Sequence, residues 1–294
     1  MNQKKADLLI AFISIAWGSS YLLMKIGLNG LGVFNLITLR FGIAFIITAL
    51  IFIKHILKTN LKTILYESIL GFILFSSFTF LMMGLKTTDA SSAGFLTSTA
   101  VVFVLILQIL VTHKKPQISI TLGVTLTVLG IALLTIKNHF ILEKGSILCV
   151  VGAFSFAVHI IITNKFTRKT EGLLLGIYQL GFAALYGLIF SIIFEKTSLP
   201  ESSTEWAAVL GLAIICSAFG FVAQPIAQKY TTPERTGLLF SLEPVSSAVF
   251  AYIFLHEVLL FKGCIGAFLV LLGVFISGMK NNASKVQKVQ LVDQ

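Results

Sequence analysis

The chain has 294 residues, of which 56% are hydrophobic and only 12% are charged. Soluble domains carry about 25% charged residues, so this composition excludes an ordinary soluble protein and predicts a membrane protein. The net charge of +10 does not indicate nucleic-acid binding, because the basic residues lie in short gaps between apolar runs.

In chain order, ten apolar runs approach the roughly 20 residues that a helix needs to cross a bilayer. The first run follows Lys4 and Lys5, but it is longer than a signal peptide and is predicted to remain as a span. The predicted spans are 7–28, 33–53, 64–84, 90–112, 118–136, 145–164, 172–194, 205–228, 235–255 and 262–279. The connections are short, and residues 280–294 are expected to form a disordered cytoplasmic tail.

Basic residues are distributed unevenly between the two sets of alternate gaps. Fifteen Lys and Arg residues lie in one set and five in the other. Because cytoplasmic loops carry the excess of positive charge, both termini are predicted to be cytoplasmic. We therefore expect a multi-pass protein of the inner or plasma membrane.

An internal repeat relates the two halves of the chain. The superposed pairs are Lys86/Lys229, Thr88/Thr231, Gly94/Gly237, Ser98/Ser241, His113/His256, Gly123/Gly266 and Gly130/Gly273 at a shift of 143, and Trp17/Phe156, Arg40/Gln179 and Gly42/Gly181 at a shift of 139. Each half holds five spans, an odd number, so the second half is expected to enter the membrane upside down. The predicted fold is an all-α membrane protein of ten transmembrane helices, arranged as two inverted five-helix repeats at 7–136 and 145–279.

The ninth predicted span carries Glu243 and Pro244 near its middle. A carboxylate in hydrocarbon is rare without a partner or a polar surrounding, and proline removes one helix hydrogen bond. Glu243 is therefore a candidate for binding a substrate amine or a coupling proton. The structural alternatives are a latch with Arg40, or a protonated Glu243 bonded to a carbonyl that the proline leaves free.

Several short motifs and their order match one transporter family. The motifs are Trp17-Gly18-Ser19-Ser20 with Lys25, Leu39-Arg40-Phe41, Leu242-Glu243-Pro244, His256-Glu257, and the glycines Gly123, Gly130, Gly266 and Gly273. Over about residues 7–279 the chain resembles the ten-span EamA family of the drug/metabolite transporter superfamily. The resemblance implies a carrier of small metabolites, commonly an exporter of amino acids. Ala100-Val101 stands where the second half has Glu243-Pro244, which argues against a symmetric two-carboxylate mechanism.

Arg40 lies about 10 Å inside the second predicted span, from a rise of 1.5 Å per residue. Its guanidinium is a candidate ligand for a substrate carboxylate, the alternative being that the side chain reaches the outer interface. The further candidate substrate-binding residues are polar or aromatic groups within spans: Trp17, Ser20, Tyr21, Ser98, Tyr178, Gln179, Gln224 and Ser241. For any single hydroxyl, a bond to its own helix is the competing interpretation.

Other polar residues within spans receive structural interpretations. Lys25 is expected to reach the outer interface, and His159 is interpreted as a satisfied interface residue rather than a proton relay. His256-Glu257 is expected to cap the ninth span, and the glycine-bearing fifth and tenth spans to pack at the periphery or form a dimer contact. The three cysteines are interpreted as small packing residues.

The predicted function is secondary transport, with export of small polar metabolites such as amino acids by alternating access. The alternative is efflux of lipophilic cations; an integral membrane enzyme or a channel fits less well. The sequence has no nucleotide-binding Gly-Lys loop, no zinc spacing and no nucleophile–base pair, so we expect no cofactor, no metal and no catalytic residue. The expected partners are a small-molecule substrate and the lipid bilayer, with the chain a monomer or homodimer.

Overall fold

The computed structural model describes residues 1–57, 59, 61–88, 90–113, 116–135, 144–255 and 261–278. Every regular element in these ranges is a helix, so the all-helical prediction is confirmed for the described part of the chain. In chain order the helices are α1 (Gln3–Gly18), α2 (Ser20–Gly27), α3 (Val33–Ile51), α4 (Ile53–Ile56), α5 (Leu61–Leu85), α6 (Ala90–Ser98), α7 (Ala100–Thr112), α8 (Ile118–Thr135), α9 (Lys144–Phe166), α10 (Gly172–Phe194), α11 (Ser203–Gly211), the π-helix η1 (Leu212–Phe219), α12 (Gly220–Gln228), α13 (Pro233–Phe240), α14 (Leu242–Leu255) and α15 (Phe261–Gly278).

The predicted spans are helical along their described length, apart from isolated turn residues. Six helical stretches in the described ranges are long and apolar enough to cross a bilayer: Gln3–Gly27, Val33–Ile51, Thr63–Leu85, Lys144–Phe166, Gly172–Phe194 and Ser203–Gln228. Shorter apolar helices cover Leu96–Thr112, Ile118–Gly130 and Cys264–Ile276. The chain is accordingly a multi-pass membrane protein.

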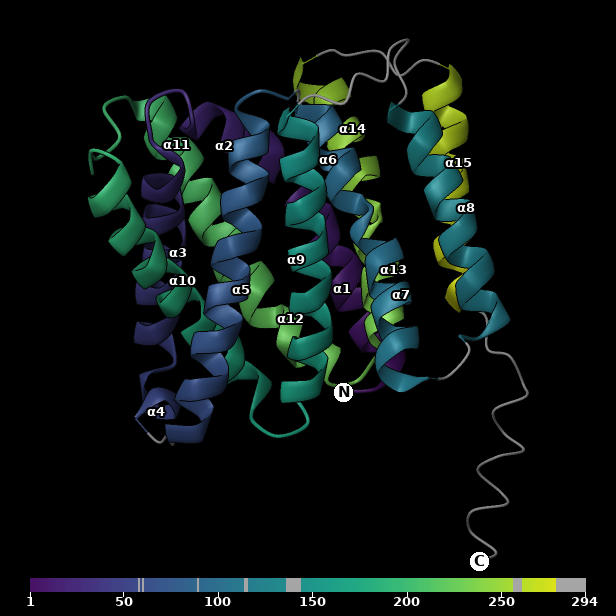
Figure 1. The fold of residues 1–294 in the computed structure, drawn as a ribbon, viewed down its shortest axis with the longest axis horizontal. Coiled ribbons are helices and arrows are strands. Elements are labelled where there is room, and N and C mark those ends of the chain that lie inside the picture. The colour runs from purple at the N-terminus through teal and green to yellow at the C-terminus, as the bar shows by residue number, and fades with distance from the viewer. Residues whose placement is uncertain are drawn as a thin grey trace, which may run out of the picture.

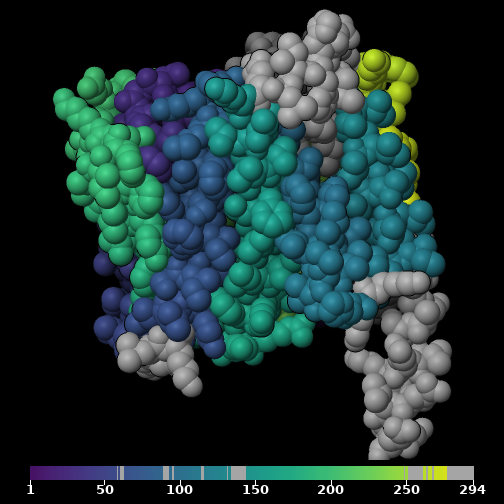
Figure 2. Space-filling view, in the orientation of Figure 1, coloured from purple at the N-terminus to yellow at the C-terminus, as the bar shows by residue number. Residues whose placement is uncertain are grey.

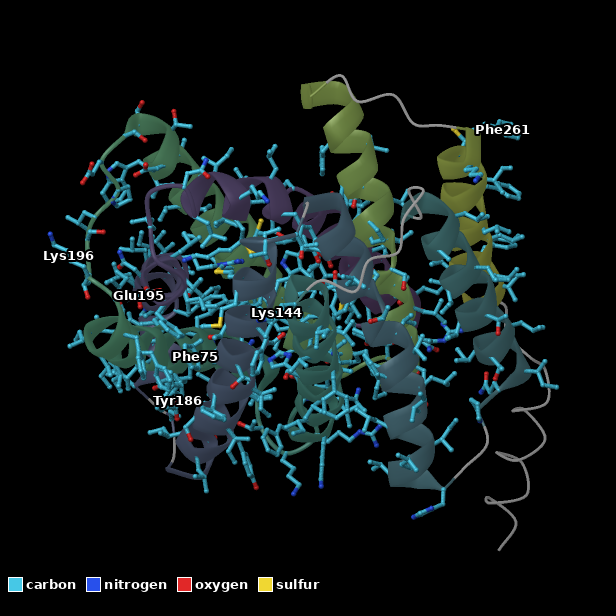
Figure 3. The ribbon with its side chains drawn as sticks, turned by 45° about the horizontal axis from the view of Figure 1, so that its top comes forward. Phe75, Lys144, Tyr186, Glu195, Lys196 and Phe261 are labelled. Carbon is cyan, nitrogen blue, oxygen red and sulfur yellow. The ribbon has the colours of Figure 1, made fainter. Side chains whose placement is uncertain are left out.

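The helices form a bundle whose two ends are easily distinguished (Figure 1). The N terminus and α4 lie at one end, the N-side end, and α2 and α11 lie at the opposite or far end. Helices α5 and α9 pack side by side and cover the centre of the face seen in Figure 2. Helix α10 packs against both α3 and α5, and Figure 3 shows Phe75 of α5 beside Tyr186 of α10, with ring centroids 6.1 Å apart.

Helices α8 and α15 pack against each other at one edge of the bundle (Figure 1). A Cβ atom at Gly130 would lie 2.5 Å from the carbonyl oxygen of Gly266, and one at Gly273 would lie 2.6 Å from that of Gly123. Real Cβ atoms do not approach backbone so closely, so only glycine permits this helix separation. This closely packed pair lies at the edge of the bundle in Figure 1, and a peripheral position is one of the two arrangements expected for these helices.

Lys25 does not simply extend to an outer interface as expected. Its Nζ donates hydrogen bonds to the carbonyl oxygens of Leu85 and Thr88, at 3.2 and 3.0 Å. These carbonyls lie at the C-terminal end of α5, where backbone acceptors lack helical partners and the helix dipole favours a cation. Lys25 thus ties α2 to the end of α5. The expected cap at His256-Glu257 and the expected tail at 280–294 lie outside the described residues.

Candidate functional site

Irregular backbone positions from different helices meet in the middle of the bundle. Ser19 interrupts the first long helix between α1 and α2, and its hydroxyl contacts the sulfur of Cys216 at 3.9 Å. Cys216 belongs to η1, a π-helical segment of the kind that is rare in proteins and frequent at functional sites. Ser241 interrupts the ninth stretch between α13 and α14, just before Glu243. Discontinuous helices of this kind form the substrate sites of many secondary transporters.

Arg40 lies on α3 facing this region and is 1% exposed. Its Nε donates to the Ser217 hydroxyl of η1 at 3.1 Å. The guanidinium carbon lies 4.8 Å from the ring centroid of Phe41 and 4.5 Å from that of Phe78, in cation–π geometry. Nη1 has no hydrogen-bond partner among the described residues. The alternative that Arg40 reaches the outer interface is wrong, because the guanidinium is held inside by a serine and two rings while keeping a donor free.

Glu243 lies in the first turn of α14, where its side chain meets Tyr21 of α2. The Tyr21 hydroxyl interacts with the carboxyl group of Glu243 and with the hydroxyl of Thr97 on α6. Glu243 and Arg40 are close enough to interact through their charges, yet their side chains do not form an ion pair. The latch that the sequence left open as an alternative is therefore absent from the described side chains, and the two groups lie near each other without an ion pair.

Pro244 leaves a backbone carbonyl free, and the structure shows what occupies it. Proline lacks an N–H, so the carbonyl oxygen of Phe240 four residues earlier loses its helical donor. The hydroxyl of Ser14 on α1 donates to that oxygen at 3.1 Å. Ser246 donates to the carbonyl of Glu243 at 3.0 Å. The Glu243 side chain is thus not needed to satisfy the proline site, and it stays available for other interactions.

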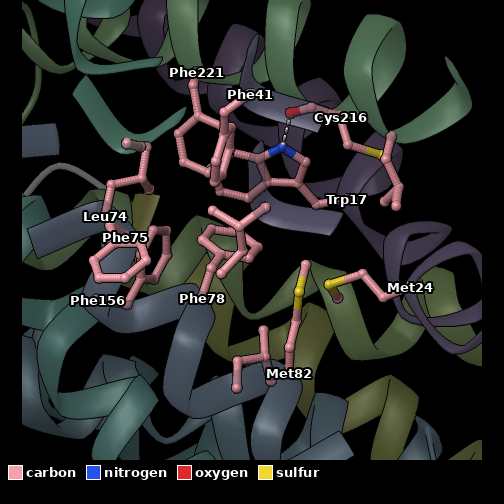
Figure 4. Packing of buried hydrophobic residues seen from close by; sticks show 14 of the residues in the cluster. Trp17, Met24, Phe41, Leu74, Phe75, Phe78, Met82, Phe156, Cys216 and Phe221 are labelled. Atoms are coloured by element: carbon pink, nitrogen blue, oxygen red, sulfur yellow. Dashed lines mark hydrogen bonds between the residues drawn. The ribbon is translucent and has the colours of Figure 1, made fainter. Parts of the chain in front are cut away.

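Trp17 is placed as a packing residue at the centre of an aromatic cluster (Figure 4). Its ring centroid lies 4.6 Å from Phe221, 4.9 Å from Phe240 and 5.8 Å from Phe156. Its Nε1 donates to the carbonyl oxygen of Cys216 at 2.7 Å. The indole N–H is therefore occupied in this conformation, and the ring packs against Phe221, which in turn contacts Phe41 beside Arg40.

Gln179, the repeat counterpart of Arg40, lies on α10 in a hydrogen-bonded chain of buried groups. Its Nε2 donates to the carbonyl oxygen of Phe221 at 2.9 Å, and its Oε1 lies 2.8 Å from Nε2 of His159. His159 is fully buried, it stacks on Phe156, and its Nδ1 has no partner among the described residues. The interpretation of His159 as an interface residue is therefore wrong: it lies within the same aromatic cluster as Trp17.

The remaining predicted site residues are spread over several positions. Ser98 and Ser241 are buried and donate to carbonyls of their own helices, Gly94 and Gly237, as the competing interpretation predicts. Ser20 is buried at the start of α2, next to Tyr21. Gln224 is buried on α12, and its Nε2 lies 3.4 Å from Oε1 of Gln228.

Tyr178 is not brought to the central cluster. Its hydroxyl donates to the carbonyl of Ile56 in α4 at 3.2 Å, and α4 lies at the N-side end of the bundle (Figure 1). The structure therefore unites Trp17, Tyr21, Arg40 and Glu243, with Gln179 adjacent, and places Tyr178 away from them.

Polar contacts also join the helices at both ends of the bundle. At the N-side end, Asp7 accepts from Nη1 of Arg235 at 2.8 Å and from the hydroxyl of Thr231 at 2.7 Å, which ties α1 to the start of α13. At the far end, the backbone N–H of Asn35 donates to the Glu195 carboxylate at 3.0 Å, which ties α3 to the end of α10.

The family model for EamA-like transporters matches the chain twice, at residues 4–136 and 143–279. The chain belongs to the EamA-like transporter family. Its relatives include two uncharacterized transporters of Archaeoglobus fulgidus: one is 29% identical over 96% of this chain and 100% of its own length, the other 30% identical over 94% and 86%. The uncharacterized transporter YoaV of Bacillus subtilis is 22% identical over 96% of this chain and 99% of its own.

One crystal structure superposes with a TM-score of 0.78 and 18% identity, covering 94% of this chain and 96% of that chain. At this identity the likeness supports the fold alone. Family membership and the apolar helices together make the chain a membrane transporter of small molecules.

Sequence reasoning missed several groups that contact the site. Ser217 and Phe78 lie against Arg40, but serine and phenylalanine are common in apolar spans and nothing distinguished these two positions. Glu67, a buried acid that lies apart from this site, could have been found, because an acid within an apolar run is the same signal that identified Glu243.

Proposed function

We propose that the chain is a carrier of the inner or plasma membrane that exports small zwitterionic metabolites, such as amino acids, by alternating access. One observation carries the proposal: Arg40 keeps a free donor near the unpaired acid Glu243, with both groups inside the bundle. Leaving opposite charges unpaired in an apolar interior is unfavourable by several kcal/mol. A ligand with one carboxylate and one ammonium group would satisfy both.

The surroundings of these charges favour a ligand with an apolar body. The rings of Phe41 and Phe78 lie against the Arg40 guanidinium, and Trp17 packs on Phe221, which contacts both rings. Ligand sites are commonly apolar with a few placed polar groups that fix orientation. Within the proposal, Arg40 binds the carboxylate, and Glu243 with Tyr21 binds the ammonium group.

Reciprocal contacts support the proposed arrangement of ten spans in two inverted repeats, 7–136 and 145–279. The carbonyl oxygen of Gly266 faces Gly130 on α8, and that of its repeat partner Gly123 faces Gly273 on α15. In such a pair of contacts, exchanging each residue for its repeat partner turns one contact into the other. This reciprocity is what a two-fold axis between the repeats produces.

The shift of 139 gives the same kind of contact near the centre. A Cβ atom at Gly42 would meet Ala184, and one at its partner Gly181 would meet Phe45, the partner of Ala184. Trp17 contacts its own partner Phe156, as residues on an axis do. The contacts between whole helices agree with this. Helix α1 packs on α12, and their repeat counterparts, α9 and α5, also pack on each other.

The direction of the spans rests on charge. The gaps rich in Lys and Arg include the segment before α1 and the one that follows α9, both at the N-side end in Figure 1. By the positive-inside rule, that end faces the cytoplasm and both termini are cytoplasmic.

Efflux of lipophilic cations is a second candidate, favoured by the aromatic Tyr21 beside Glu243. Arg40 opposes it, because a cation entering this region would meet an unneutralised guanidinium. A zwitterion needs Arg40 to bind its carboxylate, whereas a cation is repelled by Arg40. One set of ligands can therefore distinguish the two candidates.

The test uses three ligands of the same shape on the purified full chain: L-phenylalanine, phenethylamine, which lacks the carboxylate, and 3-phenylpropionate, which lacks the amine. The proposal expects thermal stabilisation and counterflow in proteoliposomes with L-phenylalanine, and much weaker effects with the other two. Binding of phenethylamine or tetraphenylphosphonium in preference to L-phenylalanine would support the cation alternative and contradict the proposal.

Glu243→Gln provides the matched variant for the same assay. It keeps the size of the side chain but loses the negative charge, so counterflow of L-phenylalanine and its response to pH should be lost while the protein still inserts. Unchanged counterflow across a pH series would show that Glu243 has no part in transport.

A further inference from the structure

A second acid lies inside the bundle, away from Glu243. Glu67 is on α5, two turns from its start at the N-side end, and is 0% exposed. Neither carboxyl oxygen has a hydrogen-bond partner among the described residues. Buried polar groups in proteins are nearly always hydrogen-bonded, so an acid with two unpartnered oxygens calls for an explanation.

Contacts one turn before and one turn after locate this side chain. The Thr63 hydroxyl lies 3.1 Å from that of Thr170, just before α10. A Cβ atom at Gly71 would lie 3.0 Å from the carbonyl oxygen of Gln179 and 3.1 Å from the backbone nitrogen of Ala183, both on α10. Residues four apart share a helix face, so Glu67 lies on the face of α5 that packs against α10.

Helix α9 borders the same region. Tyr66 stacks on Phe166 near the end of α9, and Ser77 donates to the carbonyl of Gly152 farther back, so α5 and α9 are antiparallel. This register places Glu67 within one turn of Thr163. The Thr163 hydroxyl is also fully buried and lacks a partner among the described residues.

The charged groups described around α5 do not explain why Glu67 is buried. The titratable groups on the elements packed against α5 are Lys144, Cys149, His159 and Lys165 on α9, Tyr178 and Tyr186 on α10 and Arg40 on α3, with the exposed Arg168, Lys169 and Glu171 in the α9–α10 connection. Lys165 is also exposed, and the Tyr178 hydroxyl is bonded to Ile56. Within the described chain, no charged side chain interacts electrostatically with Glu67.

We propose that Glu67 is a proton-binding site, separate from the substrate site, that loads and unloads as α5 moves against α9 and α10 during transport. In the conformation described, the carboxyl group is protonated, since an ionised carboxylate without a partner in this interior is strongly unfavourable. When the N-side end of α5 separates from α9 and α10, water reaches the group. The O–H bond then breaks, the proton passes to water and the carboxylate remains; the reverse step reloads it.

The position of Glu67 suits coupling to the substrate. Gly71, one turn away, packs on the backbone of Gln179, whose side chain bonds both His159 and the Phe221 carbonyl in the central cluster. A shift of α5 that exposes Glu67 therefore also displaces Gln179. The inference rests on the proposed carrier function, but the protonation of Glu67 can be measured without a substrate.

The first test is infrared spectroscopy of the purified full chain at neutral pH. The proposal expects the carbonyl stretch of a protonated carboxylic acid, with part of it lost in Glu67→Gln and retained in Glu243→Gln. Glu171→Gln, which changes an exposed acid at the same end, is the matched control and should leave the band intact. An unchanged band in Glu67→Gln would overturn the proposal, because Glu67 would then be ionised in the resting protein.

The second test follows proton movement with a pH-sensitive dye trapped in proteoliposomes during L-phenylalanine flux. The proposal expects Glu67→Gln to abolish the substrate-dependent pH change while counterflow continues, and Glu67→Asp to retain the pH change. A pH change like that of the unaltered protein in Glu67→Gln would overturn it. If no amino acid is carried, the proposed function fails, while the infrared result still decides whether Glu67 holds a proton.

Discussion

Gly130 and Gly273 occupy matching positions in the two halves of the chain and meet matching neighbours, whereas Arg40 and Gln179 also match and do not. Gly130 faces the carbonyl of Gly266, and Gly273 faces the carbonyl of Gly123, which is the repeat partner of Gly266. Arg40 instead bonds Ser217 between two phenylalanine rings, and Gln179 bonds His159 and a backbone carbonyl. The two halves thus share their packing and differ in their chemistry.

The same contrast holds at the two ends of the bundle. At the N-side end, Asp7 binds Thr231 and Arg235. The counterpart of Asp7 at a shift of 139 is Ser146. The neighbouring Gly145 packs on Thr88, and Thr88 is the counterpart of Thr231. The contact between helices is preserved, but among the described residues the ion pair exists at the N-side end only. A repeated scaffold needs matching shapes in both halves, whereas binding one zwitterion needs only one charge of each sign.

The largest expected effect concerns Trp17 and its counterpart Phe156, which touch each other. Truncation of a buried aromatic side chain to alanine costs about 3–5 kcal/mol, and Trp17→Ala also leaves the Cys216 carbonyl without its donor. Trp17→Ala should therefore lower the melting temperature of the detergent-solubilised protein more than Phe156→Ala does. Phe72→Ala, at a half-exposed ring, is the control, and a loss as large as that of Trp17→Ala there would contradict a central role for the cluster.

Arg40→Gln replaces Arg40 with the residue type found at its repeat counterpart, Gln179. Hydrogen bonds to charged groups contribute about 1.5–3 kcal/mol, so the affinity for L-phenylalanine should fall by roughly one to two orders of magnitude. The affinity for phenethylamine, which has no carboxylate, should not fall. Lys196→Gln, at an exposed position, is the charge-matched control, and equal losses for both ligands in Arg40→Gln would indicate a structural rather than a binding role.

Alanine substitutions at the α8–α15 contact test whether the two halves pack equivalently. Gly130→Ala and Gly273→Ala each force a Cβ against backbone, and overpacking of this kind costs about 1–3 kcal/mol. The two variants should lower the melting temperature by similar amounts. Gly42→Ala is the control, since its Cβ would lie 3.7 Å from that of Ala184, an ordinary contact. A large difference between Gly130→Ala and Gly273→Ala would show that the contact is not reciprocal.

The smallest effect is expected at the asymmetric ion pair. Asp7 and Arg235 are 20% and 16% exposed, so Asp7→Asn should destabilise the protein by no more than about 1 kcal/mol. Because salt screens exposed charges, the difference in melting temperature from the unaltered protein should shrink as salt is added. A difference that is independent of salt would mean that Asp7 acts through its hydrogen bond to Thr231 rather than through charge.

Much of the fold could be predicted from the sequence because a bilayer imposes simple rules. A helix that crosses it must be about 20 apolar residues long, so the positions of the helices follow from hydrophobicity. The break before Glu243 also follows locally, since Pro244 cannot donate a helix hydrogen bond. The interruption at Ser19 and the π-helix around Cys216 could not be predicted, because neither has a local signal and both depend on neighbouring helices.

The candidate site divides in the same way. The sequence alone determined that Arg40 and Glu243 are charges inside apolar spans, because the type of a residue and its depth along a helix are local properties. Only the tertiary structure decided that they lie near each other without pairing, that Trp17 uses its N–H on Cys216, that Tyr178 bonds α4 instead, and that Glu67 has no partner in the described part of the chain. These facts depend on which face each helix turns toward its neighbours, and in spans that are apolar all round the hydrophobic pattern does not specify that face.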